Sequence, residues 1–141
     1  MSTEVIVYIL TGLAAVVIVL TRLRLGRGDK GAGRLQMGHG LVNLHTVAGV
    51  LALVLWVVFL VAGEDTAAGS DTVGIAALAC WWVVVAAGLL ILVRWLPSRG
   101  KHASDGQKDS WSDGPGLSIL AHVGMLVGVI VFTWAYLKAV V

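Results

Sequence analysis

Four long apolar runs constrain this 141-residue chain more than any other feature of its sequence. They cover residues 5–21, 41–62, 73–93 and 117–137, and none of them contains Asp, Glu, Lys or Arg. A helix needs about 20 apolar residues to cross the hydrocarbon core of a bilayer. The runs therefore predict an all-α integral membrane protein, a bundle of four transmembrane helices.

Composition leaves little room for anything else. Charged residues make up 13% of the chain and the mean hydropathy is +0.92, whereas about a quarter of a soluble domain is charged. We therefore expect residues 1–141 to form a single transmembrane domain. The pI near 9.0 could suggest nucleic acid, but the basic residues flank the apolar runs. That placement is typical of membrane orientation and contact with anionic lipids, so we expect lipid partners and no nucleic acid.

The charge of the connecting segments predicts the orientation of the chain. Residues 22–40 hold five basic side chains and one acid, and residues 94–116 hold four basic side chains diluted by three acids. Residues 63–72 hold three acids and no base. Basic connections stay in the cytoplasm. We therefore expect both termini outside a bacterial plasma membrane.

The second half of the chain weakly repeats the first. The segment "VLTRLRLGRG" (19–28) resembles "ILVRWLPSRG" (91–100), and "GHGLVNLH" (38–45) resembles "GPGLSILAH" (114–122). The simplest interpretation is two helical hairpins related by an axis along the membrane normal, which is a parallel repeat.

The repeat places one histidine at a corresponding point of the second and fourth runs. His45 and His122 lie about 8–9 Å inside their runs, counted from Gly40 and Gly116. Because the two spans run the same way, both rings are expected at one depth, near the cytoplasmic side. An ionisable residue within a span is costly and usually faces the protein interior, so the pair is the candidate functional site.

Axial ligation of one haem b is the economical use of two imidazoles at one depth. Packed helices lie about 8–10 Å apart, which is too close for a porphyrin. We therefore expect glycines to make room, with Gly49 and Gly124 best placed. The propionates would meet polar side chains near the cytoplasmic surface: Arg22, Arg24, Arg94 and His39.

Four spans, the paired histidines and the neighbouring glycines resemble small b-type membrane cytochromes, in particular the cytochrome b561-like group. They are also similar to uncharacterised four-span actinobacterial membrane proteins. The first resemblance covers the spans only and implies a haem protein for electron transfer or haem handling. That group usually carries histidine pairs near both membrane faces. Here the outer halves of the spans contain no histidine, so at most one haem, between the second and fourth spans, is implied.

Copper is a further hypothesis. Met125 lies three residues from His122 on the same helical face, and thioether with imidazole suits Cu(I). Met125 would be a metal ligand only in that case, since methionine otherwise fills gaps in a core. The histidines could instead join the two hairpins structurally, and the glycines of "GMLVG" (124–128) could serve helix packing or dimerisation.

The main alternative is a non-catalytic accessory subunit. Small four-span proteins can pack against a larger respiratory or transport complex, or form a homodimer. The spans contain no carboxylate of the kind that couples ion transport, and the sequence has no hydrolytic motif. The pattern therefore favours an electron carrier or an accessory subunit over a stand-alone enzyme.

Overall fold

The computed structural model describes the backbone of residues 1–27, 39–63, 65–95 and 116–141, and the side chains of 1–19, 40–63, 65–93 and 119–141. These residues form four helices: α1 (Thr3–Arg27), α2 (His39–Val61), α3 (Asp71–Trp95) and α4 (Gly116–Leu137). The described part contains no strand. The predicted all-α, four-helix class is therefore confirmed for these residues.

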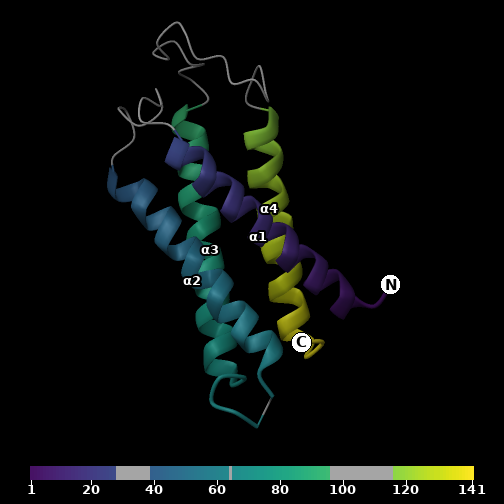
Figure 1. The fold of residues 1–141 in the computed structure, drawn as a ribbon. Helices are drawn as coiled ribbons and strands as arrows, with labels where there is room; N and C mark the ends of the chain where they lie inside the picture. Colours follow the sequence, from purple (N-terminus) through teal and green to yellow (C-terminus); the bar gives the residue numbers. More distant parts are fainter. Residues whose placement is uncertain (28–38, 64, 96–115) are drawn as a thin grey trace, which may run out of the picture.

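The helices are arranged so that α2 and α4 face each other diagonally. Helix α3 packs against both of them, and α1 lies obliquely across them (Figure 1). No Cα atom of α2 lies within 8 Å of a Cα atom of α4 in the described elements. Side chains from α2 and α4 must therefore reach across the interior to meet.

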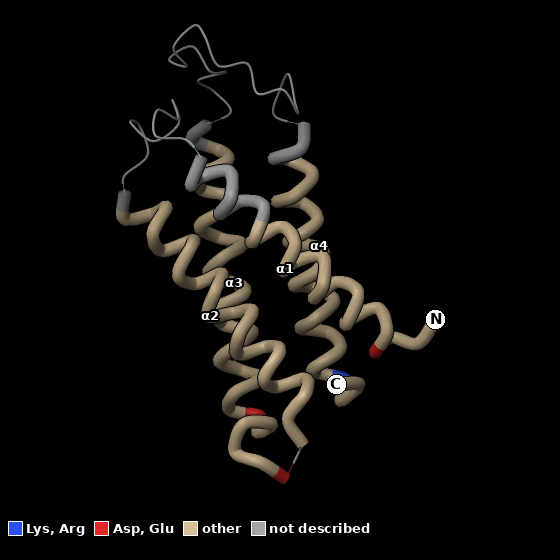
Figure 2. The backbone as a smooth tube through the Cα atoms, in the orientation of Figure 1, with Lys and Arg blue, Asp and Glu red and all other residues tan. Residues whose placement is uncertain are grey.

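The two ends of the bundle differ in charge. We call the end where α2 and α4 begin the basic end, because the segments that join there, 22–40 and 94–116, hold most of the basic residues. The opposite end, at the acidic segment 63–72, is the acidic end. Apart from Glu4 and Asp71, in the first turns of α1 and α3, the described side chains of the four helices carry no charge (Figure 2). Such a charge-free band suits a hydrocarbon environment.

Three helices are long and apolar enough to cross a membrane. The segments are Gly40–Val61, Asp71–Val93 and Ile119–Leu137. For α1, only Thr3–Val19, the part whose side chains are described, enters this comparison, and it is shorter than a span requires. The structure thus gives three candidate spans, and the fourth stays a prediction.

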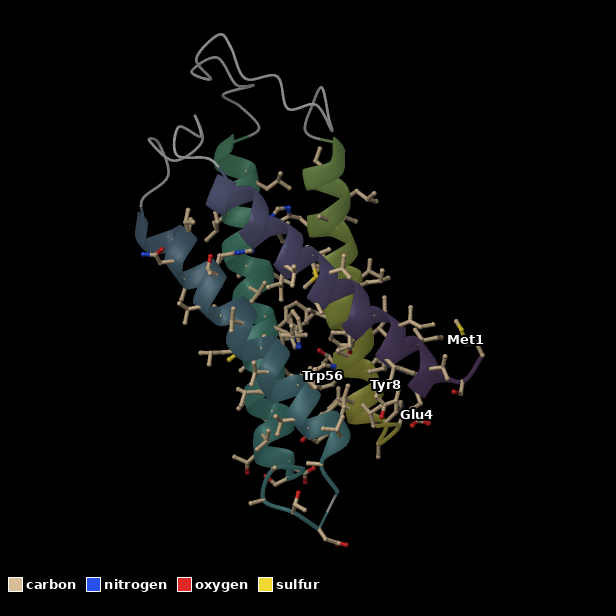
Figure 3. The ribbon with its side chains drawn as sticks, viewed as in Figure 1. Met1, Glu4, Tyr8 and Trp56 are labelled. Carbon is tan, nitrogen blue, oxygen red and sulfur yellow. The ribbon has the colours of Figure 1, made fainter. Side chains whose placement is uncertain are left out.

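An aromatic core fills the bundle between its middle and the acidic end. Trp56, Trp81 and Phe132 are almost fully buried. The Phe132 ring lies 5.0 Å from Trp56 and 5.8 Å from Trp81 between ring centres. Figure 3 shows Trp56 directed into the interior. Aromatic rings of this size dominate the energetics of a core, so they hold α2, α3 and α4 together here.

Each helical hairpin has a tryptophan–threonine hydrogen bond. Trp56 Nε1 of α2 donates to Thr11 Oγ1 of α1 at 3.1 Å, and Trp82 Nε1 of α3 donates to Thr133 Oγ1 of α4 at 3.2 Å. Trp56 and Thr133 are 77 residues apart, which is also the spacing of the two histidines. The donor tryptophan therefore lies on the second helix of the first hairpin, but on the first helix of the second hairpin. The two hydrogen bonds correspond in type, with the positions of donor and acceptor reversed.

Candidate metal site

His45 of α2 and His122 of α4 meet across the interior of the bundle. Their ring centres are 6.3 Å apart and their planes are tilted by 42°. Both side chains are half-buried. His45 shares a helix face with the buried residues Ala48, Ala52 and Trp56, a spacing that directs one stripe of a helix inward.

A glycine of α3 lies between the two rings. A Cβ atom on Gly88 would be 3.0 Å from His45 Nε2, 3.1 Å from His122 Nε2 and 2.8 Å from His122 Cδ2. Real Cβ atoms essentially never approach closer than about 3 Å. Glycine at position 88 therefore lets the two imidazoles approach α3 together, because only main chain stands there.

Sequence reasoning placed the room-making glycines elsewhere. A Cβ on Gly49 would meet the side chains of Ile18 and Val84 at 3.9 Å, and neither histidine. Gly124 is exposed, and a Cβ there would meet nothing within 4 Å. Since neither glycine borders the rings, the role that the sequence assigned to them falls to Gly88. No local motif marks Gly88, because its importance comes from the histidines of two other helices.

The remaining predicted site residues divide into two groups. Met125 is partly buried and packs against the hydrophobic core. The side chains expected near the propionates lie outside the described residues: Arg22, Arg24, Arg94 and His39. In the described part of the chain, no three His, Cys, Asp or Glu residues gather into a metal-binding group. The two imidazoles are therefore the donors that the site offers, with Met125 one turn away.

The spacing of the rings suits two imidazoles on one metal ion. Metal–nitrogen bonds of about 2 Å place two rings on opposite sides of one ion with their centres about 6 Å apart, close to the observed 6.3 Å. Imidazole is a ligand for Zn, Cu, Fe and Ni. Donor type and separation therefore fit a two-histidine metal site.

Helix α3 lies close to the histidine pair, and this limits the room for a porphyrin between the rings. The Cβ direction of Gly88 points to a place nearly equidistant from the two Nε2 atoms, at 3.0 and 3.1 Å. Such a place lies in the plane that bisects the pair, which is the plane a porphyrin would occupy. The main chain of α3 would have to move outward to admit the ring.

Comparisons with known proteins give no information on the function of this site. No family model, no curated protein and no solved structure matches the chain.

Proposed function

We propose that this is a bacterial plasma membrane protein that binds one metal centre between α2 and α4. His45 and His122 would be the ligands of a b-type haem. The function of the protein would be electron transfer or haem handling, and both termini would lie outside. The observation that supports the proposal is the approach of two imidazoles, from diagonal helices, to a ring-centre distance of 6.3 Å. Haem iron commonly takes histidine as an axial ligand.

The haem proposal carries a structural requirement. Helix α3 would have to lie farther from the pair to admit a porphyrin, because the main chain at Gly88 is close to both Nε2 atoms. Because Gly88 has no side chain, α3 could still pack closely against the porphyrin after moving. Burial in the apolar bundle and the polar partners of the imidazoles would then tune the iron.

The optical spectrum of detergent-purified protein, produced with added haem precursor, tests the proposal. We expect an oxidised Soret band that shifts on reduction, together with sharp visible bands. His45→Ala and His122→Ala should each abolish these bands, whereas His102→Ala, a histidine outside the spans, should leave them unchanged. Protein without haem absorbance, or haem retained in both site variants, would contradict the proposal.

A single cuprous ion is the second candidate, and Gly88 is the observation that favours it. A single ion needs no room for a macrocycle beside Gly88, whereas a porphyrin needs α3 to lie farther from the pair. Met125, one turn from His122, could add a thioether. We expect stoichiometric Cu(I) binding in a competition assay with a cuprous chelator, lost in His45→Ala. In Met125→Leu, binding should weaken only if the thioether is a ligand.

The same preparation distinguishes these metal centres from an accessory role. Protein that carries neither haem nor copper, and that purifies with a larger membrane enzyme, would support an accessory subunit. The two histidines would then act as a structural link between the hairpins.

A further inference from the structure

The path of α1 follows α2 along the bundle. Thr11 of α1 accepts a hydrogen bond from Trp56 of α2, and a Cβ on Gly49 of α2 would lie 3.9 Å from Ile18 Cδ1 of α1. Seven residues along α1 therefore correspond to seven along α2 in the opposite direction. Helix α1 runs obliquely (Figure 1), and it remains beside α2 as it approaches the height of the histidine pair.

The face of α4 that points toward α1 is buried only in part of its length. Among the described helices, α4 contacts α1 and α3. Because Thr133 bonds to Trp82 of α3, the opposite side of α4 is the one that faces α1. On that side Gly128 and Ala135 are buried, whereas Gly124, one turn nearer the basic end, is exposed. The cover that α1 gives to α4 therefore ends between positions 128 and 124.

The inner face of α4 shows the same change at the height of His122. Residues seven apart lie almost two full turns apart and share a face of a helix. Three residues of α4 are half-buried, and the residues seven positions farther along are all buried: Ala121, His122 and Met125, against Gly128, Val129 and Phe132. Part of the cover over this face is therefore lost beside the histidine.

The other two helices remain closed at this height. Gly88 and Leu92 of α3 are buried, and so are Ala48 and Gly49 of α2. The partly exposed side of the pair is therefore the side between α1 and α4, opposite α3. It lies within the candidate span Ile119–Leu137, where the surroundings of a membrane protein are hydrocarbon. We call this side, bordered by Ala121, Gly124 and Met125, the lipid-facing side.

The lipid-facing side is where a porphyrin finds room. An ionisable residue within a span ordinarily faces the protein interior, so a half-buried histidine next to lipid needs a reason. On the α3 side, the main chain at Gly88 stands close to both Nε2 atoms. A macrocycle held between the rings would therefore extend away from α3, toward the lipid-facing side. Its apolar edge is more stable against acyl chains than in water.

We propose that haem reaches the histidine pair laterally from the bilayer, between α1 and α4. The proposal rests on the proposed function for the identity of the ligand, and it adds the route. Haem dissolved in the membrane would pass Ala121 and Met125 and would be bound with one edge toward lipid. The loading of the protein would then follow the haem content of the membrane rather than that of the water on either side.

The lipid-facing side is tested first in protein without haem. The full chain with Cys80→Ser and Ala121→Cys carries a nitroxide label in vesicles. Oxygen, which concentrates in the bilayer, and a water-soluble nickel chelate are compared as relaxing agents. We expect oxygen to dominate, as it should for Ala86→Cys on an exposed face of α3 near the height of the pair. A label at position 121 that is shielded from oxygen, or that the nickel chelate relaxes more strongly, would overturn the proposal.

The route is tested by the rate of haem transfer from haem-containing vesicles to vesicles with haem-free protein, followed by the growth of the Soret band. Ala121→Phe places a ring on the lipid-facing side and should slow the transfer several-fold at the same final haem content. Ala86→Phe, which adds the same ring on α3, should leave the rate unchanged. If Ala121→Phe lowers the final haem content, Ala121→Leu takes its place.

The outcomes separate the route from the function. Equal transfer rates in the two variants would refute lateral entry while leaving haem binding intact. Wild-type protein that takes up haem from no source would refute the proposed function, and the nitroxide measurement would still decide whether this side of the pair is open to lipid.

Discussion

At the scale of single residues, the lack of a side chain at Gly88 determines how closely the His45 and His122 rings can approach α3. Gly88→Ala would place a methyl group about 3 Å from both Nε2 atoms. We expect this change to lower haem or copper occupancy strongly, because the rings must turn away from each other. Metal content per protein and the optical spectrum measure the effect.

Gly124→Ala is the matched control, since both glycines lie within a helix and only one borders the rings. An alanine at position 124 would meet nothing within 4 Å and favours helix by about 1 kcal/mol over glycine. It should keep the metal and raise the melting temperature slightly. Equal occupancy in the two variants would argue against a site at Gly88.

Two buried tryptophans differ in the hydrogen bonding of their indole N–H groups. Trp56 Nε1 donates to Thr11, whereas Trp81 Nε1 has no partner among the described residues. Trp81→Phe should therefore lower the free energy of unfolding less than Trp56→Phe, by a difference of about 1 kcal/mol, since both changes remove similar volume. Thermal unfolding in detergent, followed by circular dichroism, measures the difference. The reverse order would indicate that Trp81 has a partner.

The residues of the site show what the sequence can and cannot predict. His45 and His122 could be paired from their depth alone, because helical rise converts position in the chain into height. Gly88 could not be found in this way, since its contacts come from two helices far away in the sequence. Gly124 shares the depth of the pair but lies on an exposed face, because the height of a residue does not determine which face of the helix turns inward.

At the scale of secondary-structure elements, the end of α4 combines a left-handed residue with a tight hydrogen bond. Ala139 has a φ of 49°, and Val140 N–H donates to the Ala135 carbonyl at 3.0 Å. Glycine adopts this conformation without strain, so Ala139→Gly should stabilise the protein by about 1 kcal/mol. Ala135→Gly, inside the same helix, should destabilise it. Melting temperatures of the two variants give the comparison, and lower values for both would show that the C-terminal turn carries no strain.

The apolar runs of the sequence coincide closely with the helices α3 and α4. The predicted run 117–137 matches α4 (Gly116–Leu137), and 73–93 matches α3 (Asp71–Trp95) to within two residues at either end. For α1, the predicted run 5–21 stops well before Arg27. An apolar run ends at the first charged residue, whereas a helix can continue through charged residues. The basic last turns of α1 therefore lie outside the apolar run.

At the scale of the whole molecule, the number of membrane crossings determines on which side each chain end lies. With four spans, both chain ends lie on the side opposite the basic end. We therefore expect cysteines introduced at Ser2 and at Val141, each in the Cys80→Ser background, to react with an impermeant reagent from the same side. With three spans, Ser2 would react from the basic side instead. Ala67→Cys serves as the reference for the acidic side.

The short uncharged run of the oblique first helix has a consequence for the surrounding lipid. The apolar segment Gly40–Val61 of α2 corresponds to about 33 Å, close to the thickness of a bilayer's hydrocarbon core. The uncharged run 5–21 of α1, between Glu4 and Arg22, corresponds to only about 26 Å, and the inclination of α1 (Figure 1) shortens its reach across the bilayer further. If α1 spans, the bilayer beside it must thin or the flanking arginines must snorkel. The molecule would then be stabilised by lipids with shorter acyl chains, and the bilayer would be thinner beside α1 than around the other helices.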